Sequence, residues 1–534
     1  MSRTLFWSLF AAALVAGLAL RLAFADARPM HHDEANQAIR FGLLLETGTY
    51  RYDPIDHHGP TLYYLTLPIA WLRGQHTLAS LDERTLRLLP ALFGAATILL
   101  CALLAGGLGR GAAAASALLV AISPAFTYYS RFYIQESAFV FFALAFLVAA
   151  GRYTTRPRAA TAAWAGGFAG LAYATKETSV IVFAAVAAAA VFARVVAIDV
   201  KSAARAGAEQ GAGRADRLAH GCIALAAAGA VALVFYSSFF TNFSGLPESI
   251  RAFSIYASRG VDAGQHDEPW YYYLRLLAWS FSGGLLWTEA LVLVLSVGGV
   301  VFAFRSRSFW PMFVAVYSIV AAGIFSALRY KTPWNLLPFY IGFVLMAGFG
   351  AGQLGRAMEL GRAATLAAWR VAMARRGLFA VVLVAGAFHL TLESWRASIV
   401  YPADPRNPYV YAQTSPDFLR LVKRVSDLAA VEPAGGNVFV KVVAGPYEQW
   451  PLPWYLRRMK RVGYWPRASD AGALDAAPVI VASAENAGAI ERTLGEGYVS
   501  EFYGLRPGVL LTLFIERDLW ERFLAARRTP GAAP

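Results

Sequence analysis

The chain has 534 residues and a formal net charge of +14, and it is 57% hydrophobic but only 15% charged, against about 25% charged residues in an ordinary globular chain. Its mean hydropathy of +0.46 implies more apolar surface than one soluble core buries, which excludes a disordered chain, a collagen-like chain and a plain cytosolic enzyme. Cys101 and Cys222 both lie in apolar runs, which excludes a disulfide framework and a cysteine zinc site. We therefore expect an integral membrane protein.

Apolar stretches of about 17–25 residues are typical of helices that cross a membrane. Eleven such stretches occur, at residues 5–25, 86–107, 112–130, 135–151, 160–175, 177–196, 218–239, 284–304, 309–328, 335–354 and 377–394. The first has no small-residue cleavage site and ends at Arg21, so we expect a retained helix and not a signal peptide. The predicted fold class is a polytopic α-helical membrane protein with about 11 transmembrane helices.

The charges between these stretches predict the orientation. With a cytoplasmic N-terminus, the inner segments carry 17 Lys and Arg residues but only four acidic residues. Such an excess is what the positive-inside rule describes. We therefore expect a multi-pass protein of the cytoplasmic (inner) membrane, with the membrane lipids as partners. The positive net charge then reflects topology, and no nucleic-acid partner is expected.

The composition changes after the eleventh stretch, which predicts a second domain. Residues 1–395 are expected to form the transmembrane domain, and residues 396–534 a small extracytoplasmic α/β domain. Short apolar runs at 438–444, 479–482 and 509–515 predict strands, and they alternate with predicted helices at 416–430, 485–494 and 518–526. Strands that alternate with helices are typical of α/β domains.

The first outer loop, residues 26–85, carries polar residues directly after the first apolar stretch. Asp33 and Glu34 form a carboxylate pair near the membrane surface, and Thr61–Leu72 predicts an amphipathic helix in the membrane interface. Neighbouring carboxylates interact, so one of them can act as a base for a hydroxyl acceptor. The alternative is a solvated loop in which Asp33 caps a helix.

Two short outer segments place charges at the ends of apolar stretches. Arg131 and Glu136 flank the first segment, and an arginine at that depth is costly unless it is paired or meets an anion. An ion pair between these two residues, or snorkelling of the arginine, is the alternative. The second segment contains Lys176 and Glu177, which a plain turn between two helices would also explain.

Arg329, Lys331 and Trp334 form a third outer group. Basic residues on this side run against the topological bias, and an anionic ligand at the outer membrane surface, such as a lipid phosphate, accounts for them. Interfacial anchoring by Trp334 and Lys331 is the alternative.

The histidines of the first outer loop raise the question of a metal. His31, His32, His57 and His58 lie among acidic residues, and such a set can ligate a divalent metal. Their spacing does not follow the i, i+4 pattern of helical metal ligands. We therefore expect no cofactor and keep a divalent metal as the alternative.

Together these features resemble the GT-C membrane glycosyltransferases, in particular the dolichyl-phosphate-mannose protein mannosyltransferases and the lipid A aminoarabinose transferases. Over residues 1–350 the resemblance rests on Asp33-Glu34, His57-His58-Gly59-Pro60, Arg87–Gly94, Ser123-Pro124, Tyr129-Ser130-Arg131 and Thr175-Lys176. A narrower resemblance, to a prokaryotic flippase-activity-associated subgroup, rests on His32-Asp33-Glu34, Lys331–Trp334, Asp404–Tyr411 and Trp450–Tyr455.

The resemblance implies a GT-C fold and transfer of a sugar from a polyprenyl-phosphate-linked donor to a lipid, glycan or protein acceptor on the extracytoplasmic face. It implies that Asp33 is the general base and that Glu34 shapes the catalytic site or binds acceptor. The implied ligands of the donor phosphate are the cations Arg131, Lys176, Arg329 and Lys331. The remaining substrate-binding residues would be Glu136, His57, His58 and Trp334. An aspartate is usual at position 136 in the aminoarabinose enzymes, where this chain has Glu136.

Two other functions stay open. A non-catalytic carrier of lipid-linked sugars, or a flippase-associated accessory protein, would need charged residues that line a path at mid-membrane. The apolar stretches contain almost none, which favours an enzyme. The third function is a scaffold whose outer α/β domain recruits partners.

Overall fold

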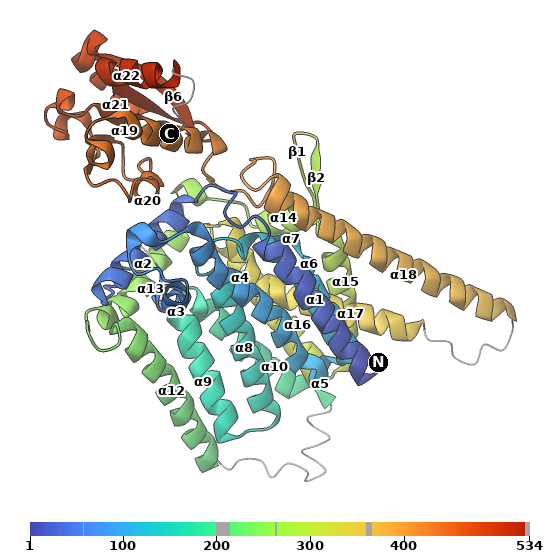
Figure 1. Ribbon diagram of the computed structural model, residues 1–534. Helices are drawn as coiled ribbons and strands as arrows, with labels where there is room; N and C mark the ends of the chain where they lie inside the picture. The colour runs from blue at the N-terminus through green and yellow to red at the C-terminus, as the bar shows by residue number, and fades with distance from the viewer. Residues whose placement is uncertain (57, 199–213, 262–263, 359–365, 529–534) are drawn as a thin grey trace.

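The computed structural model describes residues 1–56, 58–198, 214–261, 264–358 and 366–528. Long apolar helices form a bundle whose axes run in roughly one direction, while α18 slants away from it (Figure 1). These helices are α1 (Arg3–Leu22), α4 (Glu83–Leu100), α6 (Arg110–Ile122), α8 (Glu136–Thr155), α9 (Ala159–Tyr173), α10 (Ser179–Val196), α12 (Arg214–Tyr236), α15 (Ala290–Ser306), α16 (Phe309–Ala327), α17 (Leu337–Ala357) and α18 (Leu366–Trp395). Two short helical segments, η2 (Cys101–Leu104) and α5 (Ala105–Leu108), extend α4.

Each of the eleven predicted stretches overlaps one of these helices, which confirms the predicted fold class. The stretch 112–130 is divided at Ser123, and the stretch 284–304 begins before its helix, which starts at Ala290. Within the described residues, eight helices are long and apolar enough to cross a membrane. The helices α6, α9 and α15 are shorter, with 13, 15 and 17 residues. The count of 11 membrane spans therefore stays a prediction.

The remaining elements before residue 416 connect the long helices, and many of them gather at one end of the bundle (Figure 1). They are α2 (His32–Thr47), α3 (Thr61–Leu72), η1 (Leu78–Ser80), α7 (Pro124–Tyr129), α13 (Gly245–Val261), η3 (Gly264–His266), α14 (Tyr272–Ala278), β1 (Ser280–Ser282), β2 (Leu285–Trp287), η4 (Pro333–Leu336) and η5 (Arg396–Val400). The N-terminus lies at the opposite end of the bundle (Figure 1).

The C-terminal part is built on a five-stranded mixed sheet with strand order β4-β3-β5-β7-β6. Strand β3 lies parallel to β4 and β5, whereas β7 lies antiparallel to β5 and β6. The elements are α19 (Pro416–Val431), η6 (Gly435–Asn437), β3 (Val440–Val443), α20 (Leu452–Tyr455), β4 (Val462–Trp465), η7 (Ala468–Asp470), η8 (Leu474–Ala476), β5 (Val479–Ser483), α21 (Ala484–Leu494), η9 (Gly495–Gly497), β6 (Tyr498–Arg506), β7 (Val509–Glu516) and α22 (Arg517–Arg528).

The strand side chains alternate between two apolar clusters. Val440 and Val442 pack with α19 and α22, whereas Val443 and Ile480 pack with Ile490 of α21 on the other face. This alternation follows from the two-residue period of a strand and explains why helices cover both faces. The three predicted strands and three predicted helices of this part are confirmed. Strands β4 and β6 escape prediction because their residues are mostly half-buried and show no apolar run.

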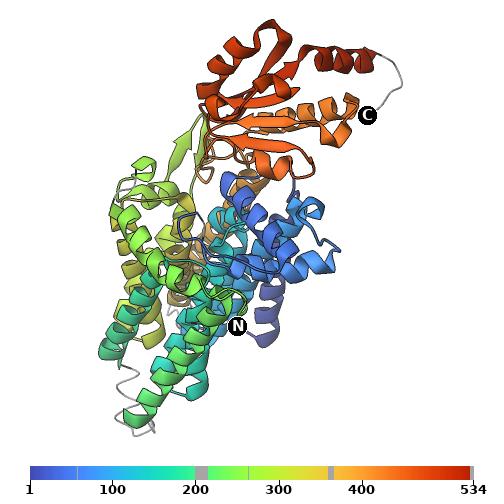
Figure 2. The same ribbon diagram turned by 90° about the vertical axis from the view of Figure 1, so that its left-hand side faces the viewer.

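The C-terminal part is docked on the first outer loop, as Figure 2 shows from the side. The Trp454 indole donates to Glu83 Oε1 at 2.8 Å, and Arg457 donates to the Leu81 carbonyl at 2.6 Å. The Met30 N–H donates to the Tyr455 hydroxyl at 2.9 Å. These buried polar contacts bring α20 beside the start of α2, where the predicted carboxylate pair lies.

Small residues allow the long helices to approach closely, as is common between membrane helices. A Cβ built on Gly299 of α15 would lie 2.0 Å from the carbonyl oxygen of Met346 on α17. The neighbouring Gly298 has nothing within 4 Å of such an atom.

We expect Gly299→Ala to destabilise the helix bundle by about 1–3 kcal/mol, the usual range for overpacking. Gly298→Ala is the matched control, and it should be neutral or slightly stabilising because alanine favours helix more than glycine. Thermal unfolding of both variants in detergent measures the difference. Equal melting temperatures would contradict this close contact between α15 and α17.

Candidate functional site

The first turn of α2 carries the predicted carboxylates, and a reciprocal capping arrangement begins it. The His31 imidazole accepts from the Asp33 N–H at 3.0 Å, and the Glu34 carboxylate accepts from the His31 N–H at 3.0 Å. The helix cap is therefore His31 and not Asp33, because α2 begins at His32, two residues earlier than an aspartate cap would require. Asp33 becomes the second residue of the helix, where the helix dipole favours a carboxylate.

Glu34 is fully buried between two arginines. Its carboxylate accepts from Arg87 at 2.9 and 3.1 Å, lies 2.8 Å from Arg28 and accepts from the Tyr133 N–H at 2.9 Å. Burial by itself raises the pKa of this carboxyl, but the charges of Arg28 and Arg87 outweigh burial and lower the pKa to about 2. Glu34 therefore holds three segments together as a permanent anion.

The side chain of Asp33 is 42% exposed, in contrast to Glu34. Its Oδ2 lies 3.7 Å from the Nδ1 atom of His31, but this nitrogen accepts the Asp33 N–H while Nε2 faces the Tyr411 carbonyl at 2.9 Å. These contacts assign His31 the neutral form with its proton on Nε2. The contact is thus no ion pair, and the Asp33 carboxylate faces outward from a fixed helix turn.

Aromatic rings from two other segments, Phe132 and Trp334, lie beside the His31 ring. Trp334 lies 5.9 Å from the His31 ring and 5.6 Å from the Tyr411 ring between centroids. The Tyr411 hydroxyl contacts Nδ1 of His266. Burial raises the pKa of Tyr411 to about 12, and the negative charges of Glu268 and Asp33 add to the rise. Asp33 and Tyr411 are therefore electrostatic neighbours.

Lys176 and Glu136 form a buried ion pair near the same aromatic group. The ammonium lies 2.5 Å from Glu136 and 2.8 Å from the Asn335 side-chain oxygen. Asn335 follows Trp334, so this pair is linked through Trp334 and His31 to Asp33. Gly59 and the turn before Lys176 are in contact, because a Cβ on Gly59 would lie 2.3 Å from the Ala174 carbonyl. The fold thus brings together motifs that are far apart in sequence.

Arg131 and Lys176 have no hydrogen-bond partner in common. It donates to the carbonyls of Leu20, Arg21 and Phe24 at 2.8, 3.1 and 3.0 Å. Glu136 pairs with Lys176 instead of Arg131, so the ion pair considered from the sequence is replaced by another. These carbonyl contacts show that Arg131 stabilises the end of α1.

The basic residues of the third predicted group connect two segments of the chain, residues 266–268 and residues 329–331. Arg329 is exposed and pairs with Asp267, and Lys331 donates from its ammonium to the Glu268 carbonyl at 2.8 Å. The backbone of Lys331 also donates to the His266 carbonyl at 3.0 Å. These contacts hold His266 where its Nδ1 atom meets the Tyr411 hydroxyl.

The remaining predicted residues are two histidines. His58 contacts Glu177 at 2.6 Å and the Tyr256 hydroxyl at 3.0 Å through Nδ1. His57 lies outside the described residues. Across the ranges that the structure describes, no group of three or more His, Cys, Asp or Glu residues could hold a metal ion.

The linking segment 404–414 contains site residues that the sequence reasoning missed. In the sequence, Tyr411 belongs to a motif of the family resemblance and has no assigned role. In the structure, its carbonyl contacts His31 and its ring contacts Trp334. Gln413 donates to the Pro29 carbonyl at 2.9 Å, and Thr414 donates to the Met30 carbonyl at 2.8 Å. The segment 404–414 has aromatic and polar residues next to prolines. This composition is the sequence signal that could have distinguished it from a plain linker.

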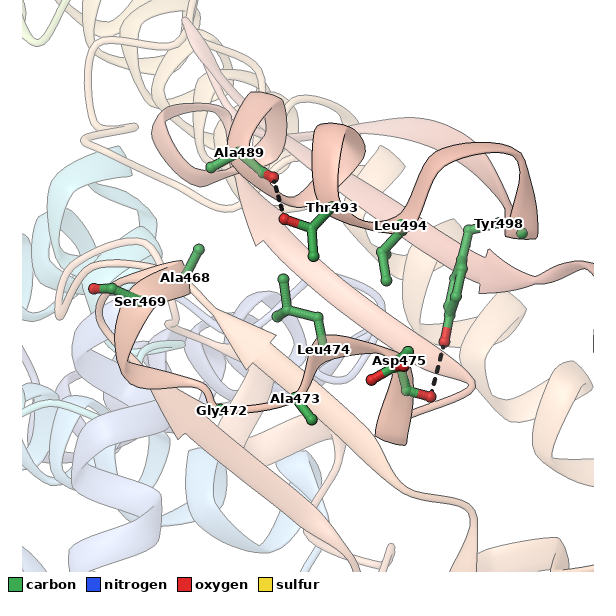
Figure 3. Close-up of a pocket in the computed structure, with 11 residues that line it drawn as sticks. Ala468, Ser469, Gly472, Ala473, Leu474, Asp475, Ala489, Thr493, Leu494 and Tyr498 are labelled. Carbon is green, nitrogen blue, oxygen red and sulfur yellow. Dashed lines mark hydrogen bonds between the residues drawn. The ribbon is translucent and has the colours of Figure 1, made fainter.

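A separate open pocket of about 640 Å³ lies in the C-terminal part, between α21 and the segment before β5 (Figure 3). The Thr493 hydroxyl donates to the Ala489 carbonyl at 3.0 Å at its rim, and Tyr498 donates to the Asp475 carbonyl at 3.4 Å. Its lining is mostly alanine, glycine and leucine, and it includes none of the predicted site residues. It therefore adds nothing to the chemistry beside Asp33.

We expect Glu34→Gln to lower the stability strongly, by about 3–5 kcal/mol, because it leaves Arg28 and Arg87 buried without a counter-charge. Asp33→Asn is the matched control and should change the melting temperature little, since Asp33 is half exposed. The pKa of Glu34 falls from 4.5 to about 2 on folding. Its contribution is therefore complete above about pH 4.5 and is lost as the pH falls toward 2.

Melting temperatures measured from pH 7 down to pH 3 provide the test. The difference in stability between wild type and Glu34→Gln should shrink below pH 4.5. A difference that does not depend on pH would contradict the ionised state assigned to Glu34.

Comparison with known proteins places this geometry in a known fold. Residues 66–204 match the family described as dolichyl-phosphate-mannose-protein mannosyltransferase. No curated protein matches the chain by sequence.

Two solved structures are similar over nearly the whole chain. One is ArnT from Cupriavidus metallidurans bound to undecaprenyl phosphate, with 16% identity, a TM-score of 0.60 and coverage of 97% of this chain and 99% of that chain. The other is the archaeal oligosaccharyltransferase AglB from Archaeoglobus fulgidus in complex with an inhibitory peptide and a dolichol-phosphate. It has 14% identity and a TM-score of 0.56, and the match covers 98% of this chain and 77% of that chain. The chain therefore has the GT-C fold and resembles the mannosyltransferase family and ArnT.

Proposed function

We propose that the protein is a membrane glycosyltransferase that moves a sugar from a polyprenyl-phosphate-linked donor to an acceptor, with Asp33 as general base. The single observation that carries the proposal is the difference in burial and pairing between the two neighbouring carboxylates, Asp33 and Glu34. Glu34 is committed to two buried arginines, whereas Asp33 is half exposed on the first turn of α2. The GT-C fold and the lipid phosphates bound to ArnT and AglB support the donor class.

The proposed reaction assigns one chemical role to each of these groups. The Asp33 carboxylate removes the proton of an acceptor hydroxyl while the hydroxyl oxygen bonds to the anomeric carbon of the donor. The bond from that carbon to the phosphate oxygen breaks, and the polyprenyl phosphate leaves with both electrons. A nearby cation stabilises the negative charge that develops on the leaving phosphate.

Lys176 suits this last role best among the predicted cations. An ammonium has three N–H donors, and Glu136 and Asn335 account for two of them. Glu136 and Asn335 then hold the ammonium in place. Arg131 donates to backbone carbonyls, and Arg329 pairs with Asp267 on the surface.

We also propose the membrane arrangement that this reaction needs. Residues 1–395 form the catalytic domain, and residues 396–534 form an outer domain on the extracytoplasmic side of the cytoplasmic membrane. The excess of basic residues in the opposite loops supports this orientation. The position of the N-terminus at the end of the bundle away from the C-terminal part agrees with it (Figure 1).

We expect Asp33→Asn to reduce transfer by about 100- to 10,000-fold, the usual contribution of a general base. A strain that lacks the gene is complemented with wild type or with the variant at matched expression, and its membrane lipids are analysed by mass spectrometry. A polyprenyl-monophosphate sugar should accumulate and be cleared by wild type alone, which also identifies the donor sugar. Equal clearance by both proteins would refute the catalytic role of Asp33 and favour a carrier or scaffold.

The role of Lys176 is tested by a double substitution. Lys176→Met alone leaves Glu136 buried without its partner, so its effect mixes folding with catalysis. The double variant Lys176→Met/Glu136→Gln removes both charges and should fold, yet we expect its transfer rate to stay at least tenfold below wild type. Recovery of full activity in the double variant would show that the pair serves the fold alone.

A further inference from the structure

We propose that the loop at residues 445–451 and His32 form a platform that binds a carbohydrate acceptor beside Asp33. This inference rests on the proposed function and names the acceptor class as a glycan. The loop joins β3 to α20 and belongs to the C-terminal part, so the platform joins two distant segments of the chain.

Three rings gather next to the proposed base. The His32 ring lies 6.0 Å from Trp450 and 6.2 Å from Tyr447 between centroids, with angles of 31° and 34° between the ring planes. His32 is the residue before Asp33, and both are half exposed. The Tyr447 side chain is 74% exposed. A surface tyrosine of this exposure offers a ring to a ligand without any cost of rearrangement.

Charged groups border these rings. Arg506 donates to the Tyr447 carbonyl at 3.3 Å. Arg506 also interacts electrostatically with His32 and with Glu448. The platform therefore combines ring faces with both a cationic and an anionic side chain.

This combination matches the chemistry of a sugar. A pyranose has an apolar face of C–H groups, which packs on an aromatic ring, and hydroxyls at its edge, which bond to charged side chains. A peptide acceptor is commonly held by main-chain bonds at the edge of a sheet. The edge strands here are β4 and β6, and the loop 445–451 belongs to neither.

The position of the platform separates the two substrates. Trp334 and the Lys176 pair belong to the helical part of the chain, and Trp334 contacts Tyr411 of the linking segment. The loop 445–451 belongs to the docked C-terminal part, between β3 and α20. A lipid-linked donor arriving from the membrane and a glycan arriving from the aqueous side would meet at Asp33.

Saturation-transfer NMR on the full-length protein in nanodiscs tests the platform. The probes are mannotriose, cellotetraose and chitotriose, with a set of serine- and threonine-containing hexapeptides as the competing class. We expect at least one oligosaccharide to bind and Tyr447→Ala to weaken its affinity about two- to tenfold, the range for one aromatic contact. Tyr447→Phe should keep the affinity because it keeps the ring.

Phe502→Ala is the matched control, since Phe502 is 69% exposed on the same part of the chain but lies on β6. It should leave oligosaccharide binding unchanged. Binding of peptides alone, binding of no oligosaccharide, or equal affinity in wild type and Tyr447→Ala would each overturn the platform.

Asp33→Asn separates this inference from the proposed function. The variant should lose transfer and keep oligosaccharide binding. Retained transfer by Asp33→Asn together with a Tyr447-dependent affinity would refute the general base but leave the platform standing. Lost binding in Tyr447→Ala and Phe502→Ala alike would overturn the platform and leave the base unaffected.

Discussion

The buried contact of Glu34 with Arg28 and Arg87 determines where the candidate site forms. A carboxylate with no exposure needs opposite charge and hydrogen bonds to offset the loss of water, and these partners come from the loop after α1 and from α4. Arg28 in turn donates to Gln413 at 2.9 Å and packs over the Phe132 ring at 3.5 Å. These two ion pairs and the contacts of Arg28 thus join the first outer loop, the start of α4, the segment around Phe132 and the link to the C-terminal part.

The same contact explains how adjacent carboxylates take different roles. Successive residues of an α-helix point about 100° apart, so fixing Glu34 inward turns Asp33 toward solvent. His31 completes the arrangement because it caps the helix with one nitrogen and reaches the Tyr411 carbonyl with the other. Asp33 therefore stands on a rigid turn without taking part in the ion pairs that make the turn rigid, which is the situation that a general base requires.

The outer cations show that charge alone does not identify a phosphate site. Arg131 is buried, yet its donors are directed at three backbone carbonyls, a common way to satisfy the end of a helix. Arg329 pairs with an exposed aspartate, and such surface pairs contribute little energy. Lys176 differs because its ammonium is held by two buried side chains, Glu136 and Asn335, the second of which follows Trp334 in the chain.

Composition and periodicity by themselves determined the helical membrane architecture and the mixed α/β nature of the C-terminal part. These features follow from hydrophobic patterns that are local in the sequence, such as the apolar stretches and the runs that became β3, β5 and β7. The family resemblance also assigned different roles to Asp33, Glu34 and Lys176, but it did not show that Glu34 is paired with Arg28 and Arg87.

Only the tertiary structure decided that Glu34 is buried and that Lys176 pairs with Glu136. It also decided that Tyr411 interacts electrostatically with Asp33 and that Tyr447 lies beside His32, the residue before Asp33. The reason is physical: burial and pairing depend on contacts between residues up to several hundred positions apart, and the one-dimensional pattern does not encode which of them meet.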